Sequence, residues 1–281
     1  MLSYAIMSLT FDQRLDRLAA RLEELPCWLI REYRDLPHWT FDGEPISLGQ
    51  GWPERRQAVT FAHGEIEVPP DWPLEQTRLD LDLGGEGLLY IRYPSREEGF
   101  GLDPYHRRFP LLGRSCSLEA RVVPHLPFGV PNRQPSMVRA RLVLVDVALE
   151  RLIRQLRLVL DAAWTLHPAD VVPHLMECAE RAIDQLDWPS HTWPYLSRLR
   201  HSPQMLAIWE PPIGLNDRPP PLDDVQQRIV AEVRERLERE VRGLRERFPP
   251  QGAIALTGQA HLDLAWLWPL QETRHKARRT A

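Results

Sequence analysis

Two residues near the end of the sequence, His261 and Asp263, have the types and spacing that could bind a metal ion. Side chains two positions apart in an extended segment point to the same side, so an imidazole nitrogen and a carboxylate oxygen could converge on one cation. Zinc accepts such a mixed ligand set, but a catalytic site needs at least one further protein ligand and an open position. On spacing alone, a histidine hydrogen-bonded to a nearby aspartate within a loop is the commoner explanation.

The segment around this pair has the pattern of a strand, a loop and a helix. Residues 253–258, AIALTG, are apolar and short enough for a buried strand, whereas residues 269–279 are polar and begin with a proline that a first helical turn tolerates. In a βα barrel the loop after a strand faces the reaction side. Trp266 and Trp268 lie in this loop, where an aromatic ring either anchors the core or offers a flat apolar face to a sugar.

A second polar constellation occupies residues 97–110, EEGFGLDPYHRRFP. Tyr105 could stack on a sugar ring and Asp103 could bind its hydroxyl groups. The simpler interpretation is a turn, because glycine supplies positive φ and an aspartate before a proline starts turns readily.

Composition excludes several classes of protein. The 281 residues carry 35 basic and 39 acidic side chains with a net charge of −4, which argues against a nucleic-acid partner bound through clustered basic residues. No window reaches the roughly 18 apolar residues of a membrane span. The three cysteines are far apart, and no secretion signal is evident, so we expect a cytoplasmic protein without a disulfide framework.

The periodicity of apolar residues predicts the order of elements. Residues 10–25 form an amphipathic helix with a capping box at Thr10 and Gln13, and apolar residues recur at helical spacing between residues 146 and 247. Between them, segments such as Leu79–Leu81–Leu83 alternate apolar and polar residues, which predicts an antiparallel sandwich with one wet face on each sheet. We therefore expect an α+β multidomain chain: an N-terminal helical segment (1–35), a β-sandwich (36–145), a helical connecting region (146–250) and the first strand and helix of an incomplete (β/α) barrel (251–281).

Residues 258–280 resemble the opening of the catalytic domain of glycoside hydrolase family 38, the retaining α-mannosidases. The family pattern is a His-x-Asp-x-x-Trp run leading to Trp-Pro and then Glu-Thr with basic residues after it. The matching positions here are His261, Asp263, Trp266, Trp268, Pro269, Glu272, Thr273 and Lys276. The chain departs from the pattern at Gln259 and Leu264, neither of which is a matched ligand. The resemblance is tight over about two dozen residues and loose upstream, where the strand-rich and helical regions and the turn at Asp103 are similar to the cytosolic and bacterial type.

The resemblance implies specific roles for three residues. His261 and Asp263 would be two ligands of a catalytic Zn²⁺, and Trp266 would line the subsite for the mannose of an α-mannoside oligosaccharide. No catalytic residue is assigned within the chain, because the nucleophilic aspartate of the family lies beyond the matched segment. We expect this polypeptide alone to be inactive, and its terminal barrel strand to need neighbours, supplied by a second copy or by a complementing polypeptide.

Two other functions are also compatible with the sequence. The first is a carbohydrate-binding or interaction module built on the sandwich, without enzymatic activity, in which the terminal motif is a remnant. The second is a different metal-dependent hydrolase, since His-x-Asp pairs also serve deacetylases and barrel hydrolases; the tryptophan-rich continuation speaks against it.

Overall fold

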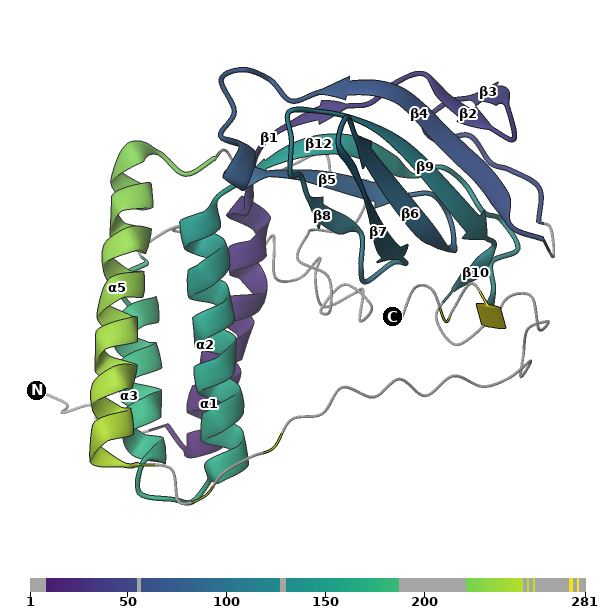
Figure 1. Cartoon of the computed structure of the whole chain (residues 1–281). Helices are drawn as coiled ribbons and strands as arrows, with labels where there is room; N and C mark the ends of the chain where they lie inside the picture. The colour runs from purple at the N-terminus through teal and green to yellow at the C-terminus, as the bar shows by residue number, and fades with distance from the viewer. Residues whose placement is uncertain are drawn as a thin grey trace, which may run out of the picture. The chain divides into compact units, whose positions relative to one another are not determined.

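The computed structural model describes residues 9–54, 57–126, 130–186 and 221–249, and the single positions 252, 255, 273, 274 and 277 (Figure 1). In these residues the fold is mixed α and β with antiparallel sheets, as the sequence predicted. They divide into two compact units, which we describe separately. One combines Glu32–Val145 with the residues from Ala255 onward, and the other combines the residues up to Arg31 with Asp146–Ile254.

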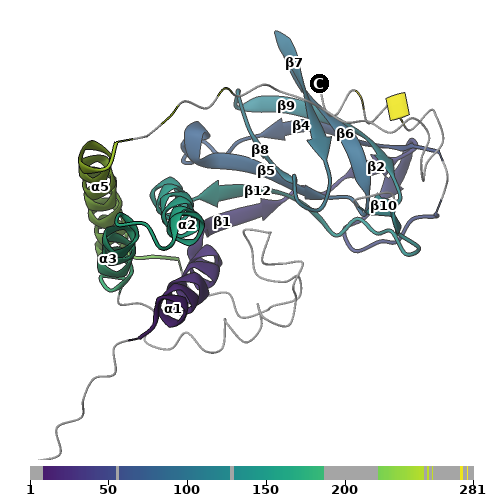
Figure 2. The same ribbon diagram turned by 90° about the horizontal axis from the view of Figure 1, so that it is seen from below.

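The helical unit contains α1 (Phe11–Glu24), α2 (Val147–Leu166), α3 (Val172–Ile183), α5 (Asp224–Arg247) and the short 3₁₀ helix η1 (Leu25–Trp28). Figure 2 shows the four long helices nearly end-on. Their apolar faces share one core. It includes Leu18 and Leu22 of α1, Leu152, Ile153 and Leu156 of α2, Met176 and Ala179 of α3, and Val230, Val233 and Leu237 of α5.

The ends of these helices follow from local sequence. The hydroxyl of Thr10 accepts the backbone N–H of Gln13 at 3.3 Å, and the side chain of Gln13 accepts the backbone N–H of Thr10 at 3.0 Å. The predicted capping box is therefore confirmed. Asp223 caps α5 in the same way. Val233 and Leu237 of α5 belong to the core, whereas Val225 lies in the first turn and is 53% exposed.

An ion pair joins the first helix to α3. The Nε and Nη2 atoms of Arg14 donate to the two carboxylate oxygens of Glu180 at 2.8 and 2.7 Å, and both side chains are largely buried. These hydrogen bonds hold the pKa of the Glu180 carboxyl below its ordinary value.

The sheet unit contains two larger antiparallel sheets and a short ribbon. The six-stranded sheet has the order β3-β2-β4-β9-β6-β7, the four-stranded sheet has the order β1-β12-β5-β8, and β10 pairs with β11. The strands are β1 (Ile30–Asp35), β2 (Trp39–Phe41), β3 (Glu44–Ile46), β4 (Val59–Glu67), β5 (Thr77–Asp82), β6 (Glu86–Tyr93), β7 (Arg96–Leu102), β8 (Arg108–Pro110), β9 (Ser115–Val123), β10 (His125–Leu126), β11 (Val130–Pro131) and β12 (Arg139–Val145).

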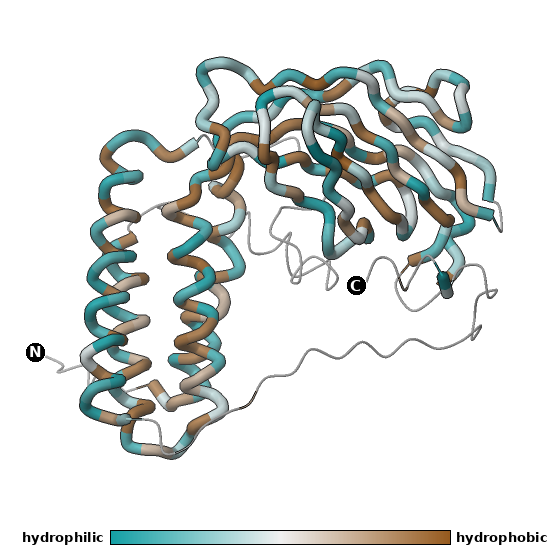
Figure 3. Tube along the Cα trace, viewed as in Figure 1, coloured by the Kyte–Doolittle hydropathy of each residue, from teal (hydrophilic) through white to brown (hydrophobic). Residues whose placement is uncertain are grey.

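One hydrophobic core lies between the two larger sheets. Leu79 and Leu81 of β5 and Leu142 of β12 contribute from one sheet, and Phe61 of β4 and Ala120 of β9 from the other. Figure 3 shows apolar and polar residues alternating along β5 and β9. The period-two pattern in the sequence therefore identified the residues that face the core.

The predicted wet face is wrong for the four-stranded sheet. Asp80 of β5 points away from the core between Leu79 and Leu81, yet it is fully buried. Arg141, directly opposite on β12, donates from Nε to its Oδ2 at 2.9 Å. Nη1 of Arg139 lies 3.6 Å from the same oxygen, and Nε of Arg107 lies 3.8 Å from Oδ1. Alternation separates the two faces correctly, but ion pairing allows charged residues to occupy a buried face.

Replacing Asp80 by asparagine is expected to lower the free energy of unfolding by about 3 kcal/mol, because it removes the negative charge from a set of buried arginines. Urea unfolding at pH 7, followed by circular dichroism and tryptophan fluorescence, measures this. The matched control is Asp82→Asn, two positions along the same strand. Its half-buried carboxylate accepts the backbone N–H of Gly84 at 3.2 Å, so we expect a loss below about 1 kcal/mol. Equal losses in the two variants would contradict this role of Asp80.

Replacing Glu180 by glutamine is expected to lower the free energy of unfolding by about 1 kcal/mol at pH 7. Because the folded-state pKa of Glu180 is lowered, its stabilisation is present above the unfolded-state pKa and is lost as pH falls through the folded-state pKa. The difference between wild type and variant should therefore shrink in unfolding experiments below about pH 4. Glu177→Gln, one turn earlier on α3 and 53% exposed in its side chain, should change stability by less than about 0.5 kcal/mol. A pH-independent difference would refute the ion-pair explanation.

Candidate functional site

The predicted metal ligands His261 and Asp263, and the predicted sugar-contacting Trp266, lie outside the described residues. Within the residues that the structure describes, no group of three histidine, cysteine, aspartate or glutamate side chains could hold a metal ion.

The second constellation, residues 97–110, contains more regular structure than the sequence indicated. Its first part belongs to the edge strand β7 and its last part to β8, and only the residues between Leu102 and Arg108 form a turn. The backbone N–H of Asp103 donates to the carbonyl oxygen of His106 at 3.2 Å, which closes the turn.

The carboxylate of Asp103 is engaged within this turn. Its Oδ1 accepts the backbone N–H groups of Tyr105 at 2.7 Å and His106 at 2.8 Å, and its Oδ2 lies 2.9 Å from Nδ1 of His106. Tyr105 itself is 45% exposed. This geometry favours a structural role for Asp103 and weakens the sugar site that the sequence placed here.

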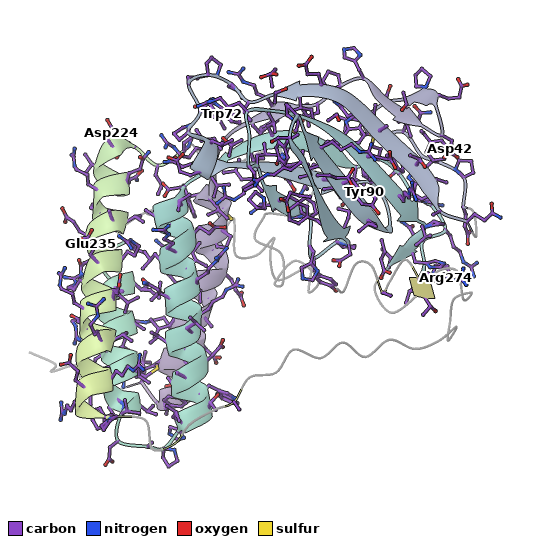
Figure 4. The ribbon with its side chains drawn as sticks, viewed as in Figure 1. Asp42, Trp72, Tyr90, Asp224, Glu235 and Arg274 are labelled. Atoms are coloured by element: carbon purple, nitrogen blue, oxygen red, sulfur yellow. The ribbon has the colours of Figure 1, made fainter. Side chains whose placement is uncertain are left out.

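A more organised polar surface lies on the outward face of the six-stranded sheet. Residues directly opposite each other in adjacent strands share a face, and strand pairing places Thr40, Ala62, Glu119, Tyr90 and Gly99 in one row across β2, β4, β9, β6 and β7. The neighbours of Tyr90 in β6, Leu89 and Ile91, belong to the core, so Tyr90 points outward. Figure 4 labels Tyr90 on this sheet.

Charged side chains surround this tyrosine in a connected hydrogen-bonded network. We call this network, together with the row of residues named above, the Tyr90 face. Arg92 donates from Nε to Glu97 at 2.6 Å and from Nη1 to Glu119 at 2.8 Å. Nε of Arg121 donates to the other oxygen of Glu119 at 3.3 Å. The hydrogen bond from Arg92 is the main cause that lowers the pKa of Glu119, so this carboxylate stays charged at neutral pH.

Sequence reasoning missed this surface because its members come from five strands. The local pattern of β6, with Tyr90 and Arg92 alternating with core residues, marks an outward face. Which side chains of other strands lie beside Tyr90 depends on strand order and register, and no local pattern carries that information.

Other shifted titratable groups are isolated from this surface and have simple causes. Burial raises the pKa of Glu24 in α1, and it raises the pKa of the thiols of Cys116 and Cys178 to about 11. Burial lowers the pKa of His63, whose Nε2 lies 2.6 Å from the carbonyl oxygen of Pro37. Thiols with raised pKa are poor nucleophiles, so neither of these two cysteines is a candidate catalytic residue.

Comparison with known proteins does not assign a family, since no protein-family model matches the chain and no curated protein matches it. None of the helices in the described ranges is both long and apolar enough to cross a membrane.

Replacing Asp103 by alanine is expected to lower the free energy of unfolding by about 1 kcal/mol, because two backbone N–H groups lose their acceptor. Asp103→Asn retains an acceptor oxygen and should recover most of this loss, and Tyr105→Ala should change stability by less than about 0.5 kcal/mol. Thermal and urea unfolding measure these differences. A loss of sugar binding in Asp103→Ala with unchanged stability would instead restore the sugar-binding interpretation of the turn.

Proposed function

We propose that this chain is the N-terminal part of a zinc-dependent retaining α-mannosidase that hydrolyses terminal α-mannosidic bonds in oligosaccharides. The observation that carries the proposal is the terminal sequence, in which His261, Asp263 and Trp266 are followed by Trp268 and Pro269 in the order of the family pattern. In this proposal, residues 251–281 form the first strand and helix of a (β/α) barrel, preceded by the helical and sheet units.

The donor set of the terminal segment fits zinc. His261 supplies an imidazole nitrogen and Asp263 a carboxylate oxygen, and both are ordinary zinc ligands. Bound there, zinc would stabilise negative charge and hold substrate hydroxyl groups near the reacting centre. Trp266 would pack its apolar ring against the CH groups of the sugar and exclude water.

The remaining chemistry requires two carboxylic acids that this proposal does not assign to the chain. A retaining glycosidase uses one as the nucleophile and the other as the acid and base, about 5 Å apart. The described residues form a helical core and a sheet core that precede the proposed barrel in the sequence. All three cysteines are buried, which is compatible with the proposed cytoplasmic location.

The proposal is tested by zinc binding to the 281-residue chain, measured by titration calorimetry and by metal analysis after dialysis. We expect Zn²⁺ binding that weakens by at least about tenfold in His261→Ala and in Asp263→Ala, because each variant removes a ligand. His106→Ala is the matched control, since His106 also lies beside an aspartate but on the exposed turn of the sheet unit.

Unchanged zinc affinity in His261→Ala and Asp263→Ala, or no zinc binding by the wild-type chain, would count against the proposal. Equal weakening in His106→Ala would show that zinc binds to surface histidines without a specific site.

A further inference from the structure

We propose that the Tyr90 face is a second, metal-independent binding surface that holds a neutral pyranoside, with α-mannoside as its ligand. The surface itself follows from the geometry of the sheet, and only the choice of mannose rests on the proposed function. Its residues differ from those of the terminal motif and from those of the turn at Asp103.

The ring of Tyr90 lies over a position without a side chain. Gly99 is directly opposite on β7, and a Cβ atom placed there would lie 3.9 Å from Cε1 and 4.0 Å from Cδ1 of the tyrosine. The ring therefore rests beside the backbone of the edge strand, and β7 contributes no side chain at that position to cover it. Gly101, the next residue of β7 on the same face, is opposite Leu88, whose side chain is buried, so the open surface does not extend in that direction. The guanidinium carbon of Arg92 lies 6.0 Å from the centroid of the ring. An aromatic ring with no side chain opposite it on the edge strand suits the CH groups of a pyranose.

Polar groups beside the ring are held in place before any ligand arrives. Glu119 accepts from Arg92 and Arg121 through different oxygens, and Glu97 anchors Arg92 from the other side. A guanidinium has five N–H donors and a carboxylate about four acceptor sites, so these groups can also bind sugar hydroxyls. Because the network already restrains the side chains, ordering them on binding costs less conformational entropy.

The charges on this face favour a neutral ligand. Two arginines, Arg92 and Arg121, are balanced by two glutamates, Glu97 and Glu119, within one hydrogen-bonded network. A polyanion such as nucleic acid or a sulfated glycan would meet as many repelling as attracting charges. A sugar needs only an apolar face and fixed donors and acceptors.

Small side chains extend the surface beyond the tyrosine. In the same row, Ala62 of β4 and Thr40 of β2 follow Glu119. Because these side chains are small, they protrude little from the sheet on the side of Glu119 away from Tyr90. The surface can therefore accommodate an oligosaccharide that continues past the residue stacked on Tyr90.

The experiment titrates methyl α-D-mannopyranoside into the full 281-residue chain in buffer containing a metal chelator, observed by saturation-transfer and ¹H–¹⁵N NMR. We expect binding with a Kd on the order of 1 mM and chemical-shift changes on β6, β7 and β9. Tyr90→Ala should weaken binding by at least about tenfold, whereas Tyr90→Phe keeps the ring and should stay within about threefold of wild type. Tyr105→Ala, which changes an exposed tyrosine of the same unit, is the matched control and should bind as wild type.

Three results would overturn the proposal. They are no detectable binding of the mannoside, equal binding by wild type and a folded Tyr90→Ala variant, and stronger binding of a sulfated sugar than of the neutral one. If the mannoside does not bind, the role of Tyr90 is to cover Gly99 of the edge strand, which stabilises β7. The proposed function is tested separately, by zinc binding that depends on His261 and Asp263. Sugar binding that depends on Tyr90, in a chain that does not bind zinc, would support this proposal and contradict the proposed function.

Discussion

The arrangement of the sheet unit depends on the buried carboxylate of Asp80. It lies on the face of β5 that points away from the core and is fully buried, with Arg141 in hydrogen-bonding contact and Arg139 and Arg107 within 3.6 and 3.8 Å. These arginines come from β12 and from the segment that leads into β8, so one carboxylate connects three parts of the chain. A slip of one residue in the register of β5 would move Asp80 into the apolar core and two leucines out of it. The ion pairs therefore make the native register much more favourable than its neighbours.

The charged side chains on the outward faces of the two sheets differ in how deeply they are buried. On the four-stranded sheet the charged groups around Asp80 are buried, so their pairing is a condition for folding. On the six-stranded sheet Arg92, Glu97 and Arg121 have close to half of each side chain exposed, so their ion pairs contribute little to stability. Residues that stability does not require can serve recognition, and this difference is why we assign binding to the Tyr90 face and a structural role to the arginines around Asp80.

The two proposals divide the protein by chemistry. One assigns metal ligation and substrate cleavage to the terminal segment and to the enzyme that its sequence resembles, and the other assigns stacking on a tyrosine to the sheet unit. A sugar-binding surface outside a glycosidase centre would raise the local concentration of an oligosaccharide near that centre, in proportion to how long it is held. Such a surface would give the sheet unit a function without requiring it to carry catalytic groups.

The sequence by itself determined the local features. The capping box at Thr10, the helical stripes of α2 and α3, and the inward leucines of β5 could all be predicted, because each depends on residues a few positions apart. It also indicated the metal-ligand types of His261 and Asp263, which the described residues do not test. The tertiary structure determined which residues lie beside one another across strands. That Asp80 is buried, that Asp103 is engaged in its own turn, and that Tyr90 meets Glu119 and Gly99 all follow from register and strand order, which are set by the packing of the whole core and by no local pattern.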